Sequence, residues 1–409
     1  MKYSVIILND TAHIDGGAAR VALSSAIGLA RRGHRVTLFT AVAPIELPGE
    51  QPPTLEVVCT GQCDILSDPS RVAAGLRGLW NRVGWRRLQE VVSAVTRERT
   101  VIHIHGWSKA LSPSVLHLVG KAGLPAVATL HDYFLACPNG GFYNYQRQAH
   151  CKLSPLSLAC VTEACDVRCY SHKFWRLCRL LIQRQVAHYP GAIRNFIVLS
   201  EYSRRLLEPY LSPAAKLFLL SNPVDVALQK SAIPPDDAPF VFAGRLSAEK
   251  GPELFAQAIA RSGVSGVVIG DGPLRSLLQA TWPQLNFTDW LGTEDVHRRL
   301  RQARALVFPS RCHEVQGLVV LEAAALGVAS IVSDGSAARE LVIDGVTGLW
   351  FKHGDVSDLS KKIEMLQNDL DLAFQLGNAA HSRFWADPPT LERHIDQLEA
   401  VYAELSEAQ

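Results

Sequence analysis

The sequence lacks the hydrophobic segments that would place it in a membrane. Its longest apolar stretch, residues 315–333, contains Glu322 and two glycines and is therefore not a membrane span. The short apolar run at residues 5–8 is followed at once by Asn9-Asp10, which makes it too short for a secretory signal. A content of 48% hydrophobic and 20% charged residues is typical of a soluble globular protein. We therefore expect a cytoplasmic protein.

The sequence also lacks two common signatures of cofactor-dependent and metal-dependent enzymes. No complete G-x-G-x-x-G fingerprint follows the first apolar run, so a nicotinamide cofactor is not expected. The Asp-x-Asp pattern Asp369-Leu370-Asp371 lies in a polar helical stretch near the end, where solvated carboxylates are the ordinary interpretation. We expect no catalytic metal ion and no required cofactor.

A C-x-x-C pair is missing too, although the chain has nine cysteines. Five of them fall within 33 residues: Cys137, Cys151, Cys160, Cys165 and Cys169. In a cytosolic protein, clustered cysteines are more often metal ligands or reduced thiols than disulfides. These five residues therefore predict either a structural zinc site or a group of reduced packing thiols.

Length and charge indicate two domains with different surroundings. A chain of 409 residues exceeds the usual size of a single core. Residues 1–221 carry 25 Lys and Arg against 14 Asp and Glu, a net charge of +11, and residues 222–409 carry 16 against 25, a net charge of −9. The asymmetry predicts that the first half meets an anionic surface or acceptor.

The first half begins as a doubly wound α/β unit. A β-rich run at residues 3–8, Gly16-Gly17, a helical pattern at 18–32 and a second strand at 35–40 follow one another. The two glycines either make a tight turn or also approach a ligand phosphate. Further strands are predicted at residues 55–59, 101–104, 126–130 and 195–199.

Two polar features stand out in this half. His131-Asp132 directly follows the strand at 126–130, and the carboxyl end of such a strand faces the ligand crevice, although His131 could equally be a structural residue. The helical stretch 71–99 has seven arginines together with Trp80 and Trp85. It is either an ordinary amphipathic helix or one that lies on an anionic membrane surface.

In the second half, a turn-rich linker at residues 231–239 precedes a new α/β series. A strand at 240–243 leads into Gly244-Arg245 and, five residues later, Lys250. Two cations beyond a strand end can neutralise a diphosphate, one through a planar fork and one as a point charge. Glycines also follow the next strand, at Gly270 and Gly272, and should line the same crevice.

The stretch 305–327 organises this half. A strand at 305–308 is followed by Glu314, and Gly317 then opens a helix that ends at Gly327. The free N–H groups of that helix start, at Gly317 and Leu318, suit a phosphate. Glu314 and Glu322 either face one pocket from two depths or are solvated glutamates. Glu322 interrupts an apolar run, where a carboxylate is costly without a partner.

Taken together and in this order, these motifs resemble those of glycosyltransferase family 4. The motifs are Gly16-Gly17, His131, Ser221-Asn222-Pro223-Val224-Asp225, Gly244-Arg245 with Lys250-Gly251, Gly270-Asp271-Gly272-Pro273, and Glu314 with Glu322. The resemblance implies an α/β fold of the GT-B type, with two Rossmann-like doubly wound domains facing a central cleft. Residues 1–221 would be an acceptor-binding domain with a Cys-rich insertion at about 137–178. Residues 222–383 would bind a nucleotide sugar, and residues 384–409 would form a helix that packs back on the first domain.

The family also implies roles for individual residues. The catalytic group would be Arg245, Lys250, Glu314 and His131. The donor-binding group would be Gly16, Gly17, Gly244, Gly270, Gly272, Gly317, Leu318 and Glu322. Within these groups, Arg245 and Lys250 would hold the donor diphosphate, Glu322 the ribose, and Glu314 the sugar ring.

The implied function is a retaining glycosyltransferase that moves a sugar from a UDP- or GDP-sugar to a saccharide or lipid-linked saccharide. Its role would be in cell-surface polysaccharide biosynthesis, in the cytoplasm or peripherally on the inner membrane face, with no nucleic-acid partner. Fixed cations and a helix N-terminus would stabilise the leaving diphosphate without a metal. The alternatives are a nucleotide-sugar epimerase, a phosphorylase, or a silent sugar-nucleotide-binding protein.

Overall fold

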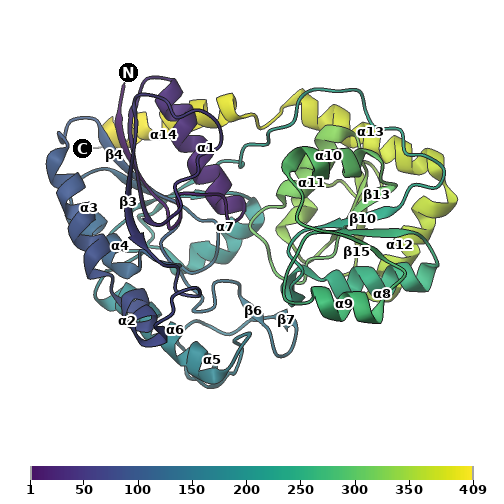
Figure 1. Ribbon diagram of the computed structural model, residues 1–409, viewed down its shortest axis with the longest axis horizontal. Coiled ribbons are helices and arrows are strands. Elements are labelled where there is room, and N and C mark those ends of the chain that lie inside the picture. Colours follow the sequence, from purple (N-terminus) through teal and green to yellow (C-terminus); the bar gives the residue numbers. More distant parts are fainter. Residues whose placement is uncertain (1, 408–409) are drawn as a thin grey trace. The chain divides into compact units, whose positions relative to one another are not determined.

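The computed structural model describes residues 2–407, which form two α/β units (Figure 1). The first unit comprises the described chain up to Gly140, Leu153–Pro223, and the described chain from Pro389 onward. The second comprises Gly141–Lys152 and Val224–Pro388. The first domain boundary predicted from the sequence, between residues 221 and 222, lies close to the point after Pro223 where the chain passes from the first unit to the second.

The first unit is built on a seven-stranded parallel sheet of order β3-β2-β1-β4-β5-β8-β9. The strands are β1 (Ser4–Leu8), β2 (Arg35–Val42), β3 (Leu55–Gln62), β4 (Thr100–Ile104), β5 (Ala126–Thr129), β8 (Asn195–Val198) and β9 (Lys216–Leu219). Strand order reverses between β1 and β4, which is the topological switch point of a doubly wound sheet. Strands β1 and β4 are almost wholly buried and accordingly read as nearly continuous apolar runs.

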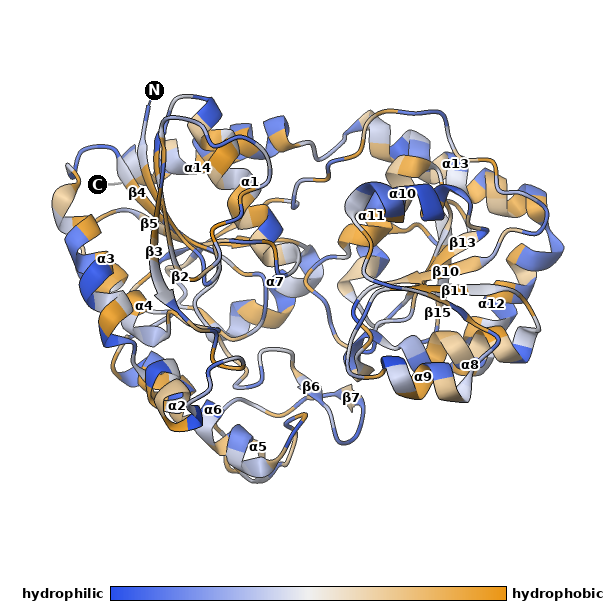
Figure 2. Cartoon of the chain, viewed as in Figure 1, coloured by the Kyte–Doolittle hydropathy of each residue, from blue (hydrophilic) through white to orange (hydrophobic). Residues whose placement is uncertain are grey.

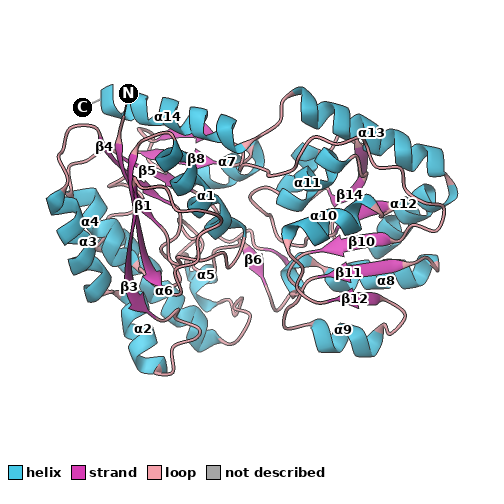
Figure 3. Cartoon of the chain, turned by 45° about the horizontal axis from the view of Figure 1, so that its top comes forward, coloured by secondary structure: helices cyan, strands magenta, loops and turns pink. Residues whose placement is uncertain are grey.

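Helices flank this sheet (Figure 3). They are α1 (Gly17–Arg31), α2 (Arg71–Leu79), α3 (Arg82–Ala94), α4 (Pro113–Lys121), α5 (Leu158–Thr162), α6 (Tyr170–Gln185), α7 (Glu201–Leu207), the 3₁₀ turn η1 (Glu208–Tyr210) and α14 (Leu391–Glu407). The single helical stretch predicted at 71–99 is wrong, because Asn81 divides it into α2 and α3. The Asn81 side chain accepts a hydrogen bond from Gly84 N at 2.9 Å and donates one to Ala110 O at 2.9 Å. An N-cap of this kind starts a new helix.

The last helix is shorter than the sequence pattern indicated. Phe384 and Trp385 end α13 rather than begin the tail helix, since Pro388-Pro389 interrupts the chain before α14. Trp385 Nε1 donates to Ala325 O at 3.0 Å within the second unit.

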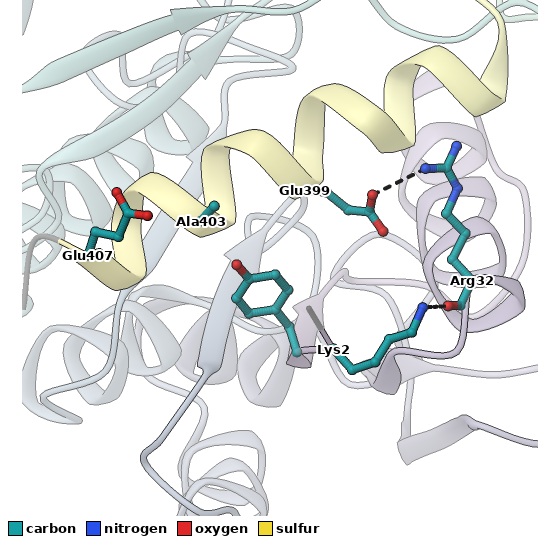
Figure 4. A pocket seen from close by; sticks show the side chains of 6 residues that line it. Lys2, Arg32, Glu399, Ala403 and Glu407 are labelled. Carbon is teal, nitrogen blue, oxygen red and sulfur yellow. Dashed lines mark hydrogen bonds and ion pairs between the residues drawn. The ribbon is translucent and has the colours of Figure 1, made fainter.

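Helix α14 packs on the first unit. His394 Nε2 lies 3.1 Å from Ser25 Oγ on α1, and Tyr402 OH lies 2.7 Å from His103 Nδ1 on β4. Figure 4 shows the far end of this interface, where Glu399 pairs with Arg32 at 3.2 Å beside a surface hollow of about 550 Å³. None of the predicted site residues lines this hollow.

The second unit has a six-stranded parallel sheet of order β12-β11-β10-β13-β14-β15. Its strands are β10 (Phe240–Ala243), β11 (Gly266–Ile269), β12 (Asn286–Thr288), β13 (Ala305–Phe308), β14 (Ser330–Ser333) and β15 (Gly348–Phe351). Its helices are η2 (Ala248–Lys250), α8 (Pro252–Ser262), α9 (Arg275–Thr281), α10 (Thr293–Arg301), α11 (Leu318–Leu326), η3 (Ala337–Leu341), α12 (Val356–Asn368) and α13 (Leu370–Ala386).

Both faces of this sheet are apolar. Along β10, Phe240 and Phe242 enter one core cluster while Val241 and Ala243 pack into another, because successive strand residues point to opposite faces. Figure 2 shows most strands of the two sheets in the hydrophobic colour. No helix among residues 2–407 combines the length and the apolar character needed to cross a bilayer.

A small antiparallel hairpin also belongs to the second unit. Strands β6 (Tyr143–Asn144) and β7 (Ala149–His150) lie in the segment Gly141–Lys152, which the sequence interpretation assigned to the first domain's insertion. The hairpin is grouped with the second unit because its side chains pack on the loop after β13, as described below.

Candidate functional site

The second unit brings its predicted site residues to one edge of the sheet. Strands β11, β10 and β13 are neighbours, and Gly270, Arg245 and Glu314 follow their respective carboxyl ends. Backbone hydrogen bonds join the loops: Gly244 N to Ile269 O at 3.0 Å, Leu246 N to Asp271 O at 2.9 Å, and Arg311 N to Glu249 O at 2.8 Å. The three loops therefore form one connected surface, at the edge where open α/β sheets bind ligands.

Close backbone approach explains why glycine occupies two of these loop positions. At Gly270, with φ +131°, an added Cβ would stand 2.2 Å from Gly244 O. At Gly251, with φ +71°, it would stand 2.2 Å from Pro309 O. A side chain at either position would push two loops apart and would adopt a backbone conformation that only glycine enters freely.

The two charged residues Lys250 and Glu314 form an ion pair at this edge. Lys250 Nζ donates to Glu314 Oε1 at 2.7 Å and to Oε2 at 2.9 Å, and Ser310 Oγ donates to Oε1 at 2.6 Å. The side chains are 32% and 12% exposed, respectively. Burial alone would lower the pKa of Lys250, but the Glu314 carboxylate outweighs it and raises that pKa above its usual value. Lys250 is therefore firmly cationic.

Glu314 itself has an unusual backbone. Its φ is +51°, in the left-handed region that a non-glycine residue enters at a cost. Cys312, two residues before Glu314, is a neutral thiol, because burial and the negative charge of Glu314 raise its pKa to about 12. The strained loop therefore presents one carboxylate held by two donors, and no reactive thiolate beside it.

Arg245 contrasts with this pair. Its side chain is exposed and makes no hydrogen bond or ion pair with any described residue. All guanidinium donors are therefore available to a ligand, and the planar fork suits phosphate oxygens.

Helix α11 supplies the remaining groups of the second unit. Gly317 is its N-cap, and Leu318 begins the first turn. The first backbone hydrogen bond of the helix runs from Val320 N to Gly317 O at 2.9 Å, so the N–H groups of Leu318 and Val319 precede it and have no partner inside the helix. Glu322 lies a little over one turn further on, and its side chain is 13% exposed. His297 Nε2 on α10 is 3.9 Å from Glu322 Oε2, so this carboxylate is not simply a solvated glutamate.

The β6–β7 hairpin packs on the loop that carries Glu314. The His150 ring stacks on His313 with centroids 3.7 Å apart and lies 4.3 Å from the His353 ring. The Gln148 side chain accepts a hydrogen bond from Arg311. Burial lowers the pKa of His150 to about 4 and that of His313 to about 3, so both rings are neutral and stack without charge repulsion.

The sequence did not predict these contacts between the hairpin and the loop that carries Glu314. Arg311 and His313 flank Cys312 in the very stretch that the motifs emphasised, but no spacing links them to His150. The two-residue strands of the hairpin also carry no periodic pattern that could have indicated where they pack.

The first unit holds the other predicted catalytic residue, His131, beyond the end of β5. Its Nε2 lies 2.9 Å from Nδ1 of His105, which follows β4, so one ring donates to the other. Burial lowers the pKa of His131 to about 3 and raises that of Asp132 to about 6. A small cavity of about 20 Å³ lies beside these three residues. His105 was missed, although its place directly after a predicted strand was a usable signal.

Gly16 and Gly17 stand at the start of α1. Gly16 is the N-cap and Gly17 the first helical residue, and the first turn has no acidic side chain. A Cβ added at Gly16 would meet nothing within 4 Å, so packing does not require glycine there. The helix start is therefore open to an anion.

The five clustered cysteines, for which the sequence left open a zinc site or reduced packing thiols, are divided between the two units. Cys151 belongs to the second unit with the hairpin, and Cys169 is exposed, whereas Cys137, Cys160 and Cys165 are buried in the first unit. Among residues 2–407, no group of three or more His, Cys, Asp or Glu side chains is placed to hold a metal ion. The geometry thus gives no support to zinc binding by these five residues.

Two family profiles together match residues 15–383 of the chain. Residues 15–228 match the profile described as Glycosyltransferase Family 4, and residues 224–383 match that described as Glycosyl transferases group 1.

Several curated proteins share part of the sequence. Alpha-D-kanosaminyltransferase of Streptomyces kanamyceticus is 28% identical over 182 residues, which cover 42% of this chain and 47% of the relative. A GDP-mannose-dependent alpha-mannosyltransferase of Corynebacterium glutamicum is 36% identical over 129 residues, 30% of each chain. The Campylobacter jejuni GalNAc-alpha-(1->4)-GalNAc-alpha-(1->3)-diNAcBac-PP-undecaprenol alpha-1,4-N-acetyl-D-galactosaminyltransferase is 32% identical over 154 residues, 35% of this chain and 42% of the relative. Each alignment spans less than half of the relative's length.

Solved structures show the same fold over the whole chain. Sucrose-phosphate synthase of Thermosynechococcus elongatus superposes with a TM-score of 0.74 at 18% identity, covering 100% of both chains. Anabaena HepE in complex with UDP-glucose gives 0.67 at 15% identity, covering 98% and 99%. These similarities confirm the GT-B fold class with its two Rossmann-like domains. Since one family profile alone covers more than half of the 409 residues and follows the motifs described above, the chain belongs to glycosyltransferase family 4.

Proposed function

We propose that this protein is a retaining glycosyltransferase that takes its sugar from a nucleotide-sugar donor, and that the second unit binds this donor. The observation that carries the proposal is the arrangement at the β11-β10-β13 edge. There, the unpaired Arg245 and the cationic Lys250 adjoin the free N–H groups that begin α11. Positive groups concentrated at this edge of a doubly wound sheet suit a diphosphate.

Each side chain has a role that its hydrogen bonds support. Arg245 offers its fork to two phosphate oxygens. Lys250 has three N–H donors, of which two bind Glu314, so the third can bind the diphosphate. Glu314 accepts from hydroxyls of the transferred sugar, and Glu322 accepts from the ribose hydroxyls.

The reaction breaks the bond between the anomeric carbon and a phosphate oxygen. Positive charge develops on the anomeric carbon and negative charge on the departing nucleoside diphosphate, which Arg245, Lys250 and the α11 N-terminus stabilise. The acceptor oxygen joins the carbon on the face that the phosphate leaves, and its proton passes to the leaving phosphate oxygen. This front-face route needs no covalent intermediate on Glu314, whose carboxylate accepts hydrogen bonds from Lys250 and Ser310.

His131 has a separate role in the first unit. Its lowered pKa keeps the ring neutral at pH 7, and its Nε2 is engaged with His105. We assign it a hydrogen bond to the transferred sugar rather than proton donation as an imidazolium.

The donor is a UDP- or GDP-sugar. The Corynebacterium relative is named for GDP-mannose, and the HepE structure holds UDP-glucose, so both nucleotides occur among similar proteins. The test is a screen of UDP, GDP and their sugar derivatives for thermal stabilisation of the protein. Each stabilising sugar nucleotide is then incubated with and without saccharide acceptors.

The expected result is stabilisation by one nucleoside diphosphate and sugar transfer that depends on the acceptor, with the anomeric configuration kept in the product as read by NMR. Conversion of the donor to its epimer without an acceptor would identify an epimerase. Stabilisation without any turnover would identify a silent binding protein.

The acceptor we propose is a lipid-linked saccharide at an anionic membrane surface, in cell-surface polysaccharide biosynthesis. The first 221 residues carry a net charge of +11. Helices α2 and α6 lie side by side, as Trp175 Nε1 donates to Gly75 O at 3.0 Å. Each helix leaves large apolar side chains in solvent, such as Leu76 at 65% and Phe174 at 58% exposure. The name of the Campylobacter relative includes an undecaprenol-linked saccharide.

Liposome flotation tests this second proposal. Binding should rise with the fraction of anionic lipid, fall in high salt, and weaken in the variant Leu76→Ser. The matched control is Leu277→Ser, which changes an exposed leucine on α9 of the second unit and should leave binding unchanged. Equal binding to neutral and anionic liposomes would refute the proposed surface.

A further inference from the structure

A buried lysine in the first unit has sulfur, not oxygen, as its partner. Lys173 on α6 is 1% exposed, and its Nζ donates to Cys165 Sγ at 2.8 Å and lies 3.9 Å from Cys160 Sγ. Among the described residues, Lys173 makes no ion pair with a carboxylate, and the nearby Asp166 pairs instead with Arg176 Nε at 3.0 Å. Burying an amine in this way is costly unless its neighbours compensate it.

The Cys165 sulfur is the centre of this arrangement. It is 5% exposed and also accepts a hydrogen bond from Asn139 Nδ2 at 3.1 Å. The same Asn139 amide donates to Cys165 O at 3.0 Å, which fixes the loop around the sulfur. Two N–H donors thus converge on this one sulfur, and a cysteine sulfur is open to oxidation by small oxidants.

We propose that Cys165 and Lys173 are a redox-sensitive modification site, at which oxidation joins the cysteine sulfur to the lysine nitrogen through one oxygen atom. The co-reactant is dioxygen. Cys165 gives up its S–H bond and Lys173 one N–H bond, and an S–O and an O–N bond form. The second oxygen atom leaves as water with the displaced hydrogens. Sulfur and nitrogen each lose two electrons, which accounts for the four electrons that reduce dioxygen.

The reverse reaction is equally defined. A dithiol such as dithiothreitol supplies four electrons from two molecules, restores the thiol and the amine, and releases the bridging oxygen as water. The cross-link is therefore reversible, in contrast to the sulfinic and sulfonic acids that an unprotected cysteine forms.

The surroundings favour this bond over other fates of the cysteine. Dioxygen and hydrogen peroxide are small enough to reach a buried sulfur, while bulky thiols such as glutathione are excluded. The amine already lies at bonding approach to the sulfur, so no loop needs to move. The link closes the short segment between Cys165 and Lys173 and thereby ties the segment before α6 to the helix itself.

Cys169 provides an internal comparison. It lies between the two partners in sequence but is exposed at the N-cap of α6, with its Sγ 3.0 Å from Ser171 Oγ. That hydrogen bond lowers the pKa of Cys169, so this thiol should be the first to react with ordinary alkylating agents. No lysine among residues 2–407 pairs with it, so it should form no lysine cross-link.

The experiment is peptide mass spectrometry of the native full-length chain, kept under dithiothreitol or exposed to dioxygen-saturated buffer, with dilute hydrogen peroxide as a second oxidant. After exposure, we expect the tryptic peptide with Cys165 to be joined to the one with Lys173, at the summed mass plus one oxygen and minus two hydrogens. Trypsin should no longer cleave after Lys173. Dithiothreitol should restore both peptides, and urea-unfolded protein should give no cross-link.

Variants separate the partners. Lys173→Met and Cys165→Ser should abolish the cross-link, while Cys169→Ser and Cys160→Ser should retain it. The wild-type measurement decides the matter even where a buried variant fails to fold. Free Cys165 after exposure, Cys165 joined to another cysteine, or one zinc ion per chain that protects Cys165 would each overturn the proposal. None of these results depends on glycosyltransferase activity.

Discussion

Substitution of Arg245 by alanine should remove activity without affecting stability. The side chain is exposed and makes no hydrogen bond or ion pair with any described residue, so its loss removes no polar interaction within the described chain. We expect the free energy of unfolding to stay within about 0.5 kcal/mol of wild type, as for surface substitutions in general.

The kinetic effect should be large, because Arg245 would stabilise negative charge that develops as the diphosphate leaves. Losing one such donor costs about 2.7–4 kcal/mol in other enzymes, which corresponds to a fall in kcat of about 10²–10³. The loss should appear in kcat more than in KM, since the interaction strengthens in the transition state. Arg245→Lys should recover only part of it, as an ammonium cannot bind two oxygens through a planar fork.

The assay is initial-rate transfer with the donor found by the thermal screen, alongside urea unfolding of each variant. Arg261→Ala is the matched control, because Arg261 is an exposed arginine in the last turn of α8. A kcat for Arg245→Ala within threefold of wild type would refute the assignment, and so would an equal loss in Arg261→Ala.

Three further predictions concern stability. Lys250→Met should lower the free energy of unfolding by up to about 3 kcal/mol, because it leaves the Glu314 carboxylate buried without its partner. In urea unfolding, the double variant with Glu314→Gln should recover at least about 1 kcal/mol of this loss, and additive losses in the two single variants would contradict the ion pair. Burial raises the pKa of Asp132 from 3.8 to about 6, so the folded protein binds the proton more tightly than the unfolded chain does. The stability that this protonated carboxyl contributes is complete below pH 3.8 and is lost as the pH rises to about 6. Asp132→Asn should therefore gain stability relative to wild type across that window, by at most about 3 kcal/mol, and a pH-independent difference would refute this. Gly251→Ala should lose at least about 2 kcal/mol, from its positive φ and the clash with Pro309 O, whereas an unchanged melting temperature would show that the two loops are not so close.

Much of the fold could be predicted because buried parallel strands are short apolar runs. Strands β1, β10 and β13 were found within a residue or two for this reason. The β9 strand was missed, since only half of its residues are even partly buried and it lies at the sheet edge. The divided helix at Asn81 was missed because the capping contact to Ala110 is made with a distant part of the chain.

Some features of the candidate site likewise have a local sequence signal, and others depend on residues far apart in the chain. Glycine and charge at strand ends are local signals, and these led to Arg245, Lys250 and Gly270, which lie at one edge of the second unit. The pair between Lys250 and Glu314 joins residues 64 apart in sequence, and no spacing could have shown it. The His150 stack on His313 depends on a hairpin whose packing only the folded chain reveals.

The most direct test of the account is calorimetric titration of UDP and GDP into wild type and Arg245→Ala, in buffer containing EDTA. The account predicts that one of the two nucleotides binds wild type without a divalent cation and that binding falls at least tenfold in the variant. Binding that requires added metal, or equal affinity in both proteins, would contradict it.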